Sequence, residues 1–194
     1  TRYGGGRLGT ARARAALLVQ LSLPGTAYLY NGDELALENV DLPDDALQDP
    51  TWERSGHTDR GRDGERVPIP WSGTEPPYGF STDASTWLPM PAGWGAKTVA
   101  AQQADADSML NLCRAALRLR RELASLNDAE FEWLPAPVGA LAYRRGSIAV
   151  VLNAGAEPLP LPDGEVLLAS GPLPEPGPDG RVLPGNTTVW LQLP

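Results

Sequence analysis

The segment 34–97 limits the possible folds more than any other feature, because neither a helical nor a strand periodicity persists along it. Such a long irregular segment is rare in a compact domain unless it is functional or disordered. Four of the six tryptophans lie within it, and they are Trp52, Trp71, Trp87 and Trp94. Because disordered segments are poor in large aromatic residues, we expect this segment to be an ordered, functional loop.

The residues before this loop predict a helix followed by a strand. Residues 10–23 are rich in alanine and leucine, with Thr10 as the expected N-cap and Pro24-Gly25 as the stop signal. Residues 26–30 are short, aromatic and bounded by Asn31-Gly32, which is typical of a strand. A buried helix that leads into a short apolar strand is half of a βαβ unit.

The residues after the loop predict one more helix and then an all-β region. Asp107-Ser108 is the expected cap of an amphipathic helix at 109–123, whose apolar stripe carries Cys113 as a small buried side chain. Beyond residue 126, short apolar runs are separated by turns rich in proline and glycine. The five expected strands are 131–134, 141–145, 148–152, 166–169 and 187–193. They predict a small sandwich or a curled sheet.

Composition excludes several classes of function. The formal charge of -8 and the pI of about 4.6 have the wrong sign for a nucleic-acid-binding surface. No apolar run approaches the roughly 20 residues that span a bilayer, so no membrane partner is expected. Cys113 and His57 are single residues of their kind, which excludes a disulfide within the chain and a zinc cluster. No calcium loop is evident, so we expect no metal, no cofactor and a reducing, cytoplasmic location.

Three separated motifs resemble one enzyme family. Residues 23–35, Leu-Pro-Gly-Thr-Ala-Tyr-Leu-Tyr-Asn-Gly-Asp-Glu-Leu, resemble the stretch at the eighth barrel strand of α-glucosidases and oligo-1,6-glucosidases. Residues 61–71 resemble the Arg-Asp-X-X-Arg signature of that family, and residues 107–121 resemble its last barrel helix. The joint match is to the α-amylase superfamily, glycoside hydrolase family thirteen.

This resemblance implies a fold class of α/β plus all-β. Residues 1–125 would form the last βα elements of a (β/α)8 TIM barrel, namely helix 7, strand 8, the long loop and helix 8. Residues 126–194 would form a small C-terminal antiparallel β-sandwich domain. Active sites of such barrels lie in the loops that follow the strands, which would explain the length of the segment 34–97.

The resemblance also implies the chemistry. Enzymes of this family are retaining glycosidases, which use two carboxyl groups about 5 Å apart. In the family pattern these carboxylates and a third aspartate lie before the position of Thr1. We therefore expect no catalytic residue in this chain, and no hydrolytic activity from the chain alone. Its expected partners are an α-linked gluco-oligosaccharide and the remainder of the barrel.

The candidate substrate-binding residues, also by resemblance, are Arg62, Arg66, Asp63 and Glu34. A guanidinium suits the closed end of a glucose pocket because its donors can hold a sugar hydroxyl and a neighbouring carboxylate together. Two roles stay open for Arg62, namely pocket binding and an ion pair that ties the loop together. For Glu34, bracing of the loop is favoured over lining the pocket.

Other residues of the loop have simpler interpretations. His57 is expected to be solvated rather than a substrate contact. Trp71 and Trp52 are expected to anchor the loop in a core rather than stack on sugars. Glu65 departs from the family, because a small residue or cysteine is usual before the second arginine of the signature. It places an extra carboxylate close to Arg66.

Three functions remain open at this point. The first is hydrolysis of α-glucosidic bonds of short oligosaccharides by a longer parent protein. The second is transglycosylation or sugar isomerisation on the same fold and carboxylates. The third is a non-catalytic carbohydrate-binding or structural module, which the tryptophan-rich loop and the β region would also fit.

Overall fold

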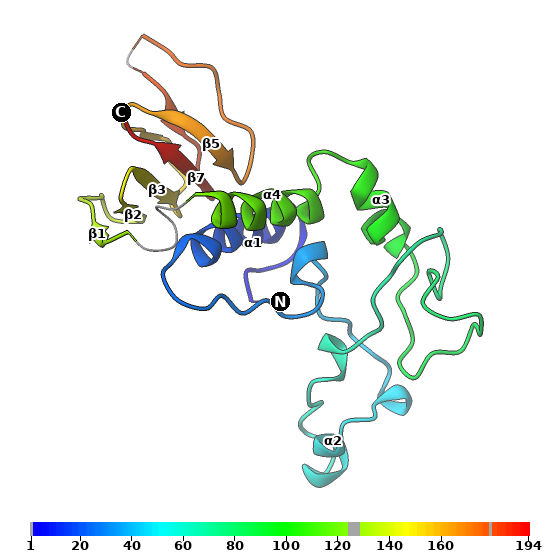
Figure 1. Ribbon diagram of the computed structural model, residues 1–194. Coiled ribbons are helices and arrows are strands. Elements are labelled where there is room, and N and C mark those ends of the chain that lie inside the picture. The colour runs from blue at the N-terminus through cyan, green and yellow to red at the C-terminus, as the bar shows by residue number, and fades with distance from the viewer. Residues whose placement is uncertain (1, 124–128, 179) are drawn as a thin grey trace. The chain divides into compact units, whose positions relative to one another are not determined.

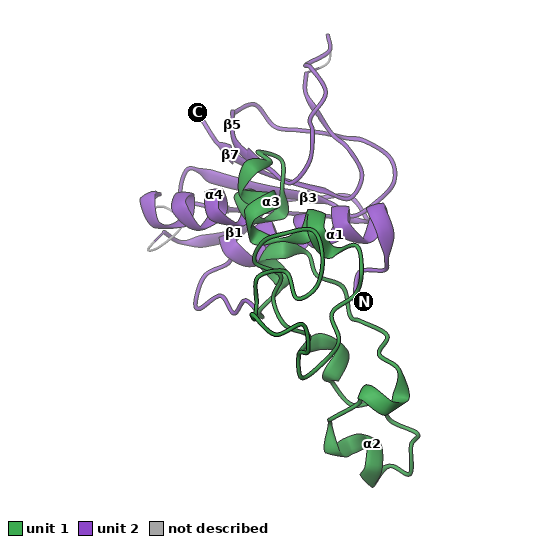
Figure 2. Ribbon diagram, turned by 90° about the vertical axis from the view of Figure 1, so that its right-hand side faces the viewer, with its two compact units in different colours: residues 1, 30–111 green, residues 2–29, 112–194 purple. Residues whose placement is uncertain are grey.

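The computed structural model describes residues 2–123, 129–178 and 180–194 (Figure 1). Contacts divide the chain into two compact units, which Figure 2 colours separately. The first unit is Tyr30–Asn111, and the second joins Arg2–Leu29 to Leu112–Pro194. The domain boundary predicted between residues 125 and 126 lies outside the described residues, so it stays a prediction.

A five-stranded antiparallel sheet is the centre of the second unit, with the order β1-β2-β3-β7-β5. Its strands are β1 Phe131–Trp133, β2 Ala140–Arg145, β3 Ile148–Asn153, β5 Glu165–Ala169 and β7 Thr187–Gln192. All five predicted strands are thereby confirmed. A separate pair, β4 Leu159–Pro160 with β6 Val182–Leu183, was not predicted, because two residues are too few to show an alternating pattern.

The two faces of this sheet are covered by different parts of the unit. On one face a core of small and branched side chains forms, including Ala149, Val151, Val189 and Leu191. On the other face the central strands contact helix α1, Gly6–Ser22. Trp190 Nε1 donates to the Leu18 carbonyl at 3.1 Å. A central strand buried on both faces loses the polar alternation of a half-exposed one, and β3 is accordingly apolar almost throughout.

Helix α1 begins earlier than predicted. Its N-cap is Gly5, so the prediction that Thr10 caps it was wrong. The Thr10 hydroxyl instead donates to the Gly6 carbonyl at 3.1 Å, one turn back in the helix. The helix ends at Ser22, with Leu23 as its C-cap directly before Pro24, as the stop signal predicted. The Arg120 guanidinium from helix α4, Met109–Glu122, donates to the carbonyls of Leu23 and Gly25 and holds this turn in place.

The predicted strand at 26–30 is not formed within the described residues. The segment belongs to neither sheet, and Tyr28 is 81% exposed. A strand exists only where a neighbouring strand accepts its hydrogen bonds. The described residues offer no such neighbour here, and aromatic propensity alone does not replace one.

The first unit is ordered around a core of its own, although most of it is irregular. Its short helical segments are η1 Asp33–Leu35, η2 Asp44–Ala46, α2 Pro50–Arg54, η3 Asp63–Glu65, η4 Trp94–Lys97 and α3 Val99–Ala104. Its core gathers Leu42, Val67, Tyr78, Leu88, Met90 and Trp94. This core explains how so long a loop keeps one conformation, as the tryptophan content predicted.

Helix α4, Met109–Glu122, follows as predicted. The Ser108 hydroxyl accepts from the Asn111 amide at 3.2 Å, which is the expected cap, and Cys113 is buried. None of the helices in the described part of the chain is long and apolar enough to cross a membrane.

The tryptophan that is buried in the loop is not one of the two that were predicted to be buried. Trp94 is the buried anchor, and its amide donates to the Tyr78 hydroxyl at 3.0 Å. Trp71 was expected in the core but is 51% exposed, so that prediction was wrong. Trp52 is half-buried against His57 and Arg60. Propensity marks tryptophan as an anchor but does not show which of several tryptophans the chain path turns inward.

Tyr143 ties α1 to the sheet, so changing it tests the packing of the second unit. Its buried hydroxyl lies 2.5 Å from Ser22 Oγ and donates to the Val19 carbonyl at 3.2 Å. Tyr143→Phe is expected to lower the free energy of unfolding by ~1–2 kcal/mol, measured by denaturant titration. The exposed Tyr28 is the control, since Tyr28→Phe should leave stability unchanged.

The burial of Tyr143 also predicts how the stability of the protein changes at alkaline pH. Burial is the main cause that raises the pKa of Tyr143 from 10.0 to about 12. The stabilisation is therefore present below pH 10 and is lost as the pH rises through the folded-state pKa. The stability difference between the wild type and Tyr143→Phe should shrink over that range. A constant difference would contradict the burial of this hydroxyl.

Candidate functional site

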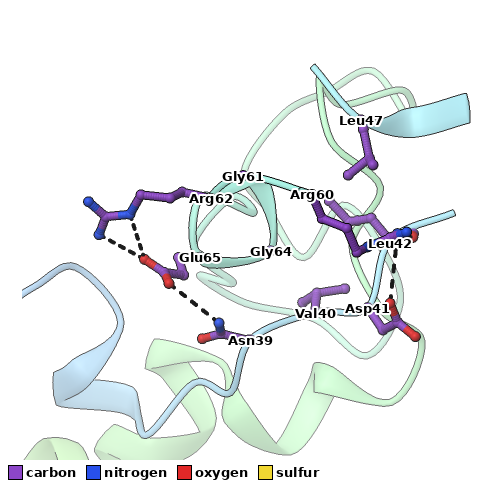
Figure 3. Close-up of a pocket in the computed structure, with 10 residues that line it drawn as sticks. All are labelled: Asn39, Val40, Asp41, Leu42, Leu47, Arg60, Gly61, Arg62, Gly64 and Glu65. Atoms are coloured by element: carbon purple, nitrogen blue, oxygen red, sulfur yellow. Dashed lines mark hydrogen bonds and ion pairs between the residues drawn. The ribbon is translucent and has the colours of Figure 1, made fainter. Parts of the chain in front are cut away.

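Two stretches of the first unit enclose a cavity of about 350 Å³ (Figure 3). One stretch is 39–42 with Leu47, and the other is 60–65 without Asp63. The Val40 amide donates to the Gly64 carbonyl at 3.0 Å, which joins the two stretches. A Cβ at Gly64 would lie 2.4 Å from the Val40 carbonyl oxygen, so only glycine allows this approach.

Asp63 belongs to the second stretch, and its side chain is fully buried. Its Oδ2 accepts from the amides of Gln48 and Asp49, each at 2.6 Å. Its Oδ1 lies 3.8 Å from Arg66 Nη1 and has no hydrogen bond among the described residues. A buried carboxylate must be paired or hydrogen-bonded to be tolerated, and the two amides and Arg66 meet that requirement.

Asp49 is a second junction in the same loop. It caps α2 by accepting from the Thr51 amide at 2.9 Å, and its Oδ2 accepts from the Arg62 amide at 3.1 Å and from Arg66 Nη1 at 2.9 Å. The hydrogen bonds from Thr51, followed by that from Arg62, hold the pKa of Asp49 well below its ordinary value. Asp49 therefore stays ionised and fixes both arginines of the signature.

The Arg62 side chain is 61% exposed at the rim of the cavity. Its Nε and Nη2 donate to Glu65 Oε2 at 3.1 and 2.8 Å, and its Cζ lies 5.9 Å from the centre of the Tyr30 ring. These hydrogen bonds lower the pKa of Glu65 and raise the pKa of Arg62. A guanidinium held on one edge keeps its remaining donors aimed outward, as a sugar-hydroxyl donor must.

Glu34 lies elsewhere in the first unit and does not line the cavity. It is half-buried in η1, and its Oε2 accepts from the Gly32 amide at 2.9 Å. This contact lies within the local turn, and the choice between bracing the loop and lining the pocket stays a prediction for Glu34.

Arg60 is a member of the site that sequence reasoning missed. Its guanidinium pairs with Asp44 at 2.5 Å and Asp41 at 3.8 Å, donates to the Leu42 carbonyl, and lies 5.6 Å from the centre of the Trp52 ring. It closes one wall of the cavity. Its partners are up to 19 residues away in the chain, so no local spacing revealed it.

His57 is exposed, as expected. Its ring stacks on Trp52 at 4.7 Å between centres and its Nε2 lies 3.2 Å from Glu53. Within the described ranges, no group of three or more histidine, cysteine, aspartate or glutamate side chains is arranged to hold a metal ion.

The sequence matches two known domain families. Residues 1–129 match the α-amylase catalytic domain, and residues 115–190 match a domain of unknown function, DUF3459. The chain belongs to the α-amylase family. The family resemblance and the fold class predicted from the sequence, an α-amylase domain segment followed by an antiparallel β domain, are confirmed.

Among its relatives in the α-amylase family are two α-glucosidases. The chain is 36% identical over 135 residues to a probable α-glucosidase of Rhizobium meliloti, covering 69% of this chain and 24% of the relative. It is 35% identical over 167 residues to a salivary α-glucosidase of Anopheles gambiae, covering 80% and 27%. The chain thus spans about a quarter of the length of the curated relatives it matches.

Solved α-amylase-family structures are also similar. The α-glucosyl transfer enzyme XgtA aligns with a TM-score of 0.79 and 32% identity, over 98% of this chain and 37% of that one. The trehalulose synthase MutB of Pseudomonas mesoacidophila aligns with a TM-score of 0.76 and 22% identity, over 94% and 38%, which supports the fold alone.

The structure brings together three of the four predicted binding residues. Arg62, Asp63 and Arg66 form one hydrogen-bonded group around Asp49, and Glu34 is not part of it. Asp63 faces backbone amides and Arg62 faces outward, so the group contains a loop brace and an exposed donor. Contact of these four residues with a sugar stays a prediction.

The Asp63 brace can be tested through the backbone it holds. Asp63→Ala leaves the amides of Gln48 and Asp49 without an acceptor, which should destabilise this loop by ~2–3 kcal/mol. Native-state hydrogen exchange should show faster exchange of those two amides. Glu53→Ala, at an exposed carboxylate of the same unit, is the control, and equal protection in both variants would contradict the assignment.

Proposed function

We propose that this chain is the C-terminal part of a retaining α-glucosidase that hydrolyses α-glucosidic bonds of short oligosaccharides in the cytoplasm. The observation that carries the proposal is the 36% and 35% identity to two α-glucosidases over most of this chain. The exposed guanidinium at the cavity supports it, because a glucose pocket needs fixed donors for hydroxyl groups.

The division of labour follows from the residues present. Retaining hydrolysis needs a nucleophilic carboxylate and a general acid/base about 5 Å apart, and these would come from residues that precede Thr1 in a longer protein. This chain would contribute the loop after the last barrel strand and the β domain. Within that loop, Arg62 would donate to hydroxyls of the terminal glucose, while Asp63, Asp49 and Arg66 keep the loop in position.

A second candidate is glucosyl transfer instead of hydrolysis. It is favoured by the 32% identity to an α-glucosyl transfer enzyme across 98% of this chain. Both reactions use the same glycosyl-enzyme intermediate and differ in whether water or a sugar hydroxyl attacks it. No side chain in the described loop distinguishes the two acceptors.

The reaction and the role of Arg62 can be tested together in the full-length protein. With maltose, isomaltose or sucrose, hydrolysis predicts glucose as the main product, whereas transfer predicts new oligosaccharides or isomers. Arg62→Ala should lower kcat/KM by about 10- to 100-fold, because it removes charge-assisted hydrogen bonds to the substrate. The exposed Arg54 supplies the control, and Arg54→Ala should leave kcat/KM unchanged. An unchanged kcat/KM in Arg62→Ala would remove Arg62 from the pocket.

The isolated chain tests the assignment of the carboxylates. It should show no turnover of a chromogenic α-glucoside, and turnover that survives repurification would mean that the catalytic groups lie within these residues.

Calorimetry with maltose on the isolated chain distinguishes a segment of an enzyme from a binding module. A segment of a pocket should bind very weakly, and appreciable affinity would favour the module.

A further inference from the structure

We propose that Glu65 is a specificity-determining residue that neutralises Arg62 and thereby restricts the cavity to uncharged glucosides, excluding sugars that carry a phosphate. This inference rests on the proposed function and adds the charge class of its substrate.

The geometry of the pair is the first support. Glu65 Oε2 accepts from both Nε and Nη2 of Arg62, so one complete edge of the guanidinium is occupied (Figure 3). The other carboxylate oxygen lies 3.5 Å from the Asn39 amide nitrogen. Phosphate binds arginine best through two parallel hydrogen bonds on one edge. An incoming phosphate would find the Nε edge taken, and at the remaining Nη1–Nη2 edge it would meet the negative charge of a carboxylate within a few ångströms.

The charges of the whole cavity point the same way. Its lining includes two cations, Arg60 and Arg62, and two anions, Asp41 and Glu65. Arg60 is paired with Asp41 and Asp44, and Arg62 is paired with Glu65. The Arg66 guanidinium nearby is paired with Asp49. Each of these three cations therefore has a carboxylate partner, and the cavity offers no surplus positive charge to an anion.

Neutral hydroxyls meet no such barrier. Arg62 keeps Nη1 and the second proton of Nη2 for acceptors of a ligand, because Glu65 uses only the Nε edge. A sugar hydroxyl needs donors but no net charge. The Glu65 carboxylate thus leaves hydroxyl binding intact while it repels a second anion.

The test uses the full-length protein with two substrates, p-nitrophenyl α-glucoside and the same glucoside phosphorylated at its 6-hydroxyl. The Glu65→Gln variant keeps the shape and an acceptor oxygen but removes the charge. The preference for the neutral substrate, as a ratio of kcat/KM values, should fall by about three- to tenfold, because solvent partly screens the charge that Glu65 places beside Arg62. Glu53→Gln removes one exposed carboxylate that does not line the cavity and should leave the ratio unchanged.

The outcomes separate this inference from the proposed function. If the wild type hydrolyses the neutral glucoside but Glu65→Gln keeps the same ratio, or changes both substrates equally, the inference is wrong and the function stands. If the wild type hydrolyses neither glucoside, the proposed function fails. A binding measurement then tests whether Glu65 keeps phosphate away from Arg62. In that measurement inorganic phosphate is titrated while the Arg62 side-chain nitrogen resonances are followed.

Phosphate should shift those resonances in Glu65→Gln at concentrations that leave the wild type unchanged. The gain in phosphate affinity of Glu65→Gln, measured by calorimetry, should be absent in the double variant Glu65→Gln with Arg62→Ala, which would locate phosphate at this guanidinium. Equal phosphate response in the wild type and Glu65→Gln would overturn the inference whatever the enzyme activity.

Discussion

The buried carboxylate of Asp63 is the interaction on which the candidate site depends. An ionised group without solvent is costly, so the chain must supply donors from several directions. The adjacent amides of Gln48 and Asp49 and the guanidinium of Arg66 do this, so two separate stretches of the loop meet at one carboxylate. The stretches around the candidate site are therefore held together by one charge rather than by a regular element. Arg62 directly precedes Asp63 in the sequence. Because the backbone at Asp63 is anchored, the Arg62 side chain is held at the rim of the cavity.

This arrangement divides the Arg-Asp-X-X-Arg signature into two physical roles. Asp63 and Arg66 face one another and Asp49, and they hold the backbone. Arg62 faces outward and is held by Glu65. A signature of this kind looks uniform in sequence, since all its members are charged. Only the burial of Asp63 and the exposure of Arg62 separate the brace from the donor.

Regular elements were predictable because their signals are local. The five strands of the β unit and helix α4 came from alternation, periodicity and turn residues, which lie within a few positions of each other. The start of α1, the missing strand at 26–30 and the exposure of Trp71 were not. The missing strand depends on a partner distant in the chain, and the exposure of Trp71 depends on which way the loop turns. Arg60 was missed for the same reason, because its role comes from Asp41, Asp44 and Trp52 together.

Glu65 shows how the effect of a charged side chain depends on the local geometry and not only on its sequence neighbours. In sequence, its carboxylate was expected to act on Arg66, the adjacent residue. In the structure Arg66 is already paired with Asp49, and Glu65 turns back by three residues to Arg62. The short η3 segment makes this possible, because side chains three residues apart lie on one side of such a turn. An added charge therefore acts on the exposed donor rather than on the buried brace, which lets charge selectivity change while the loop keeps its fold.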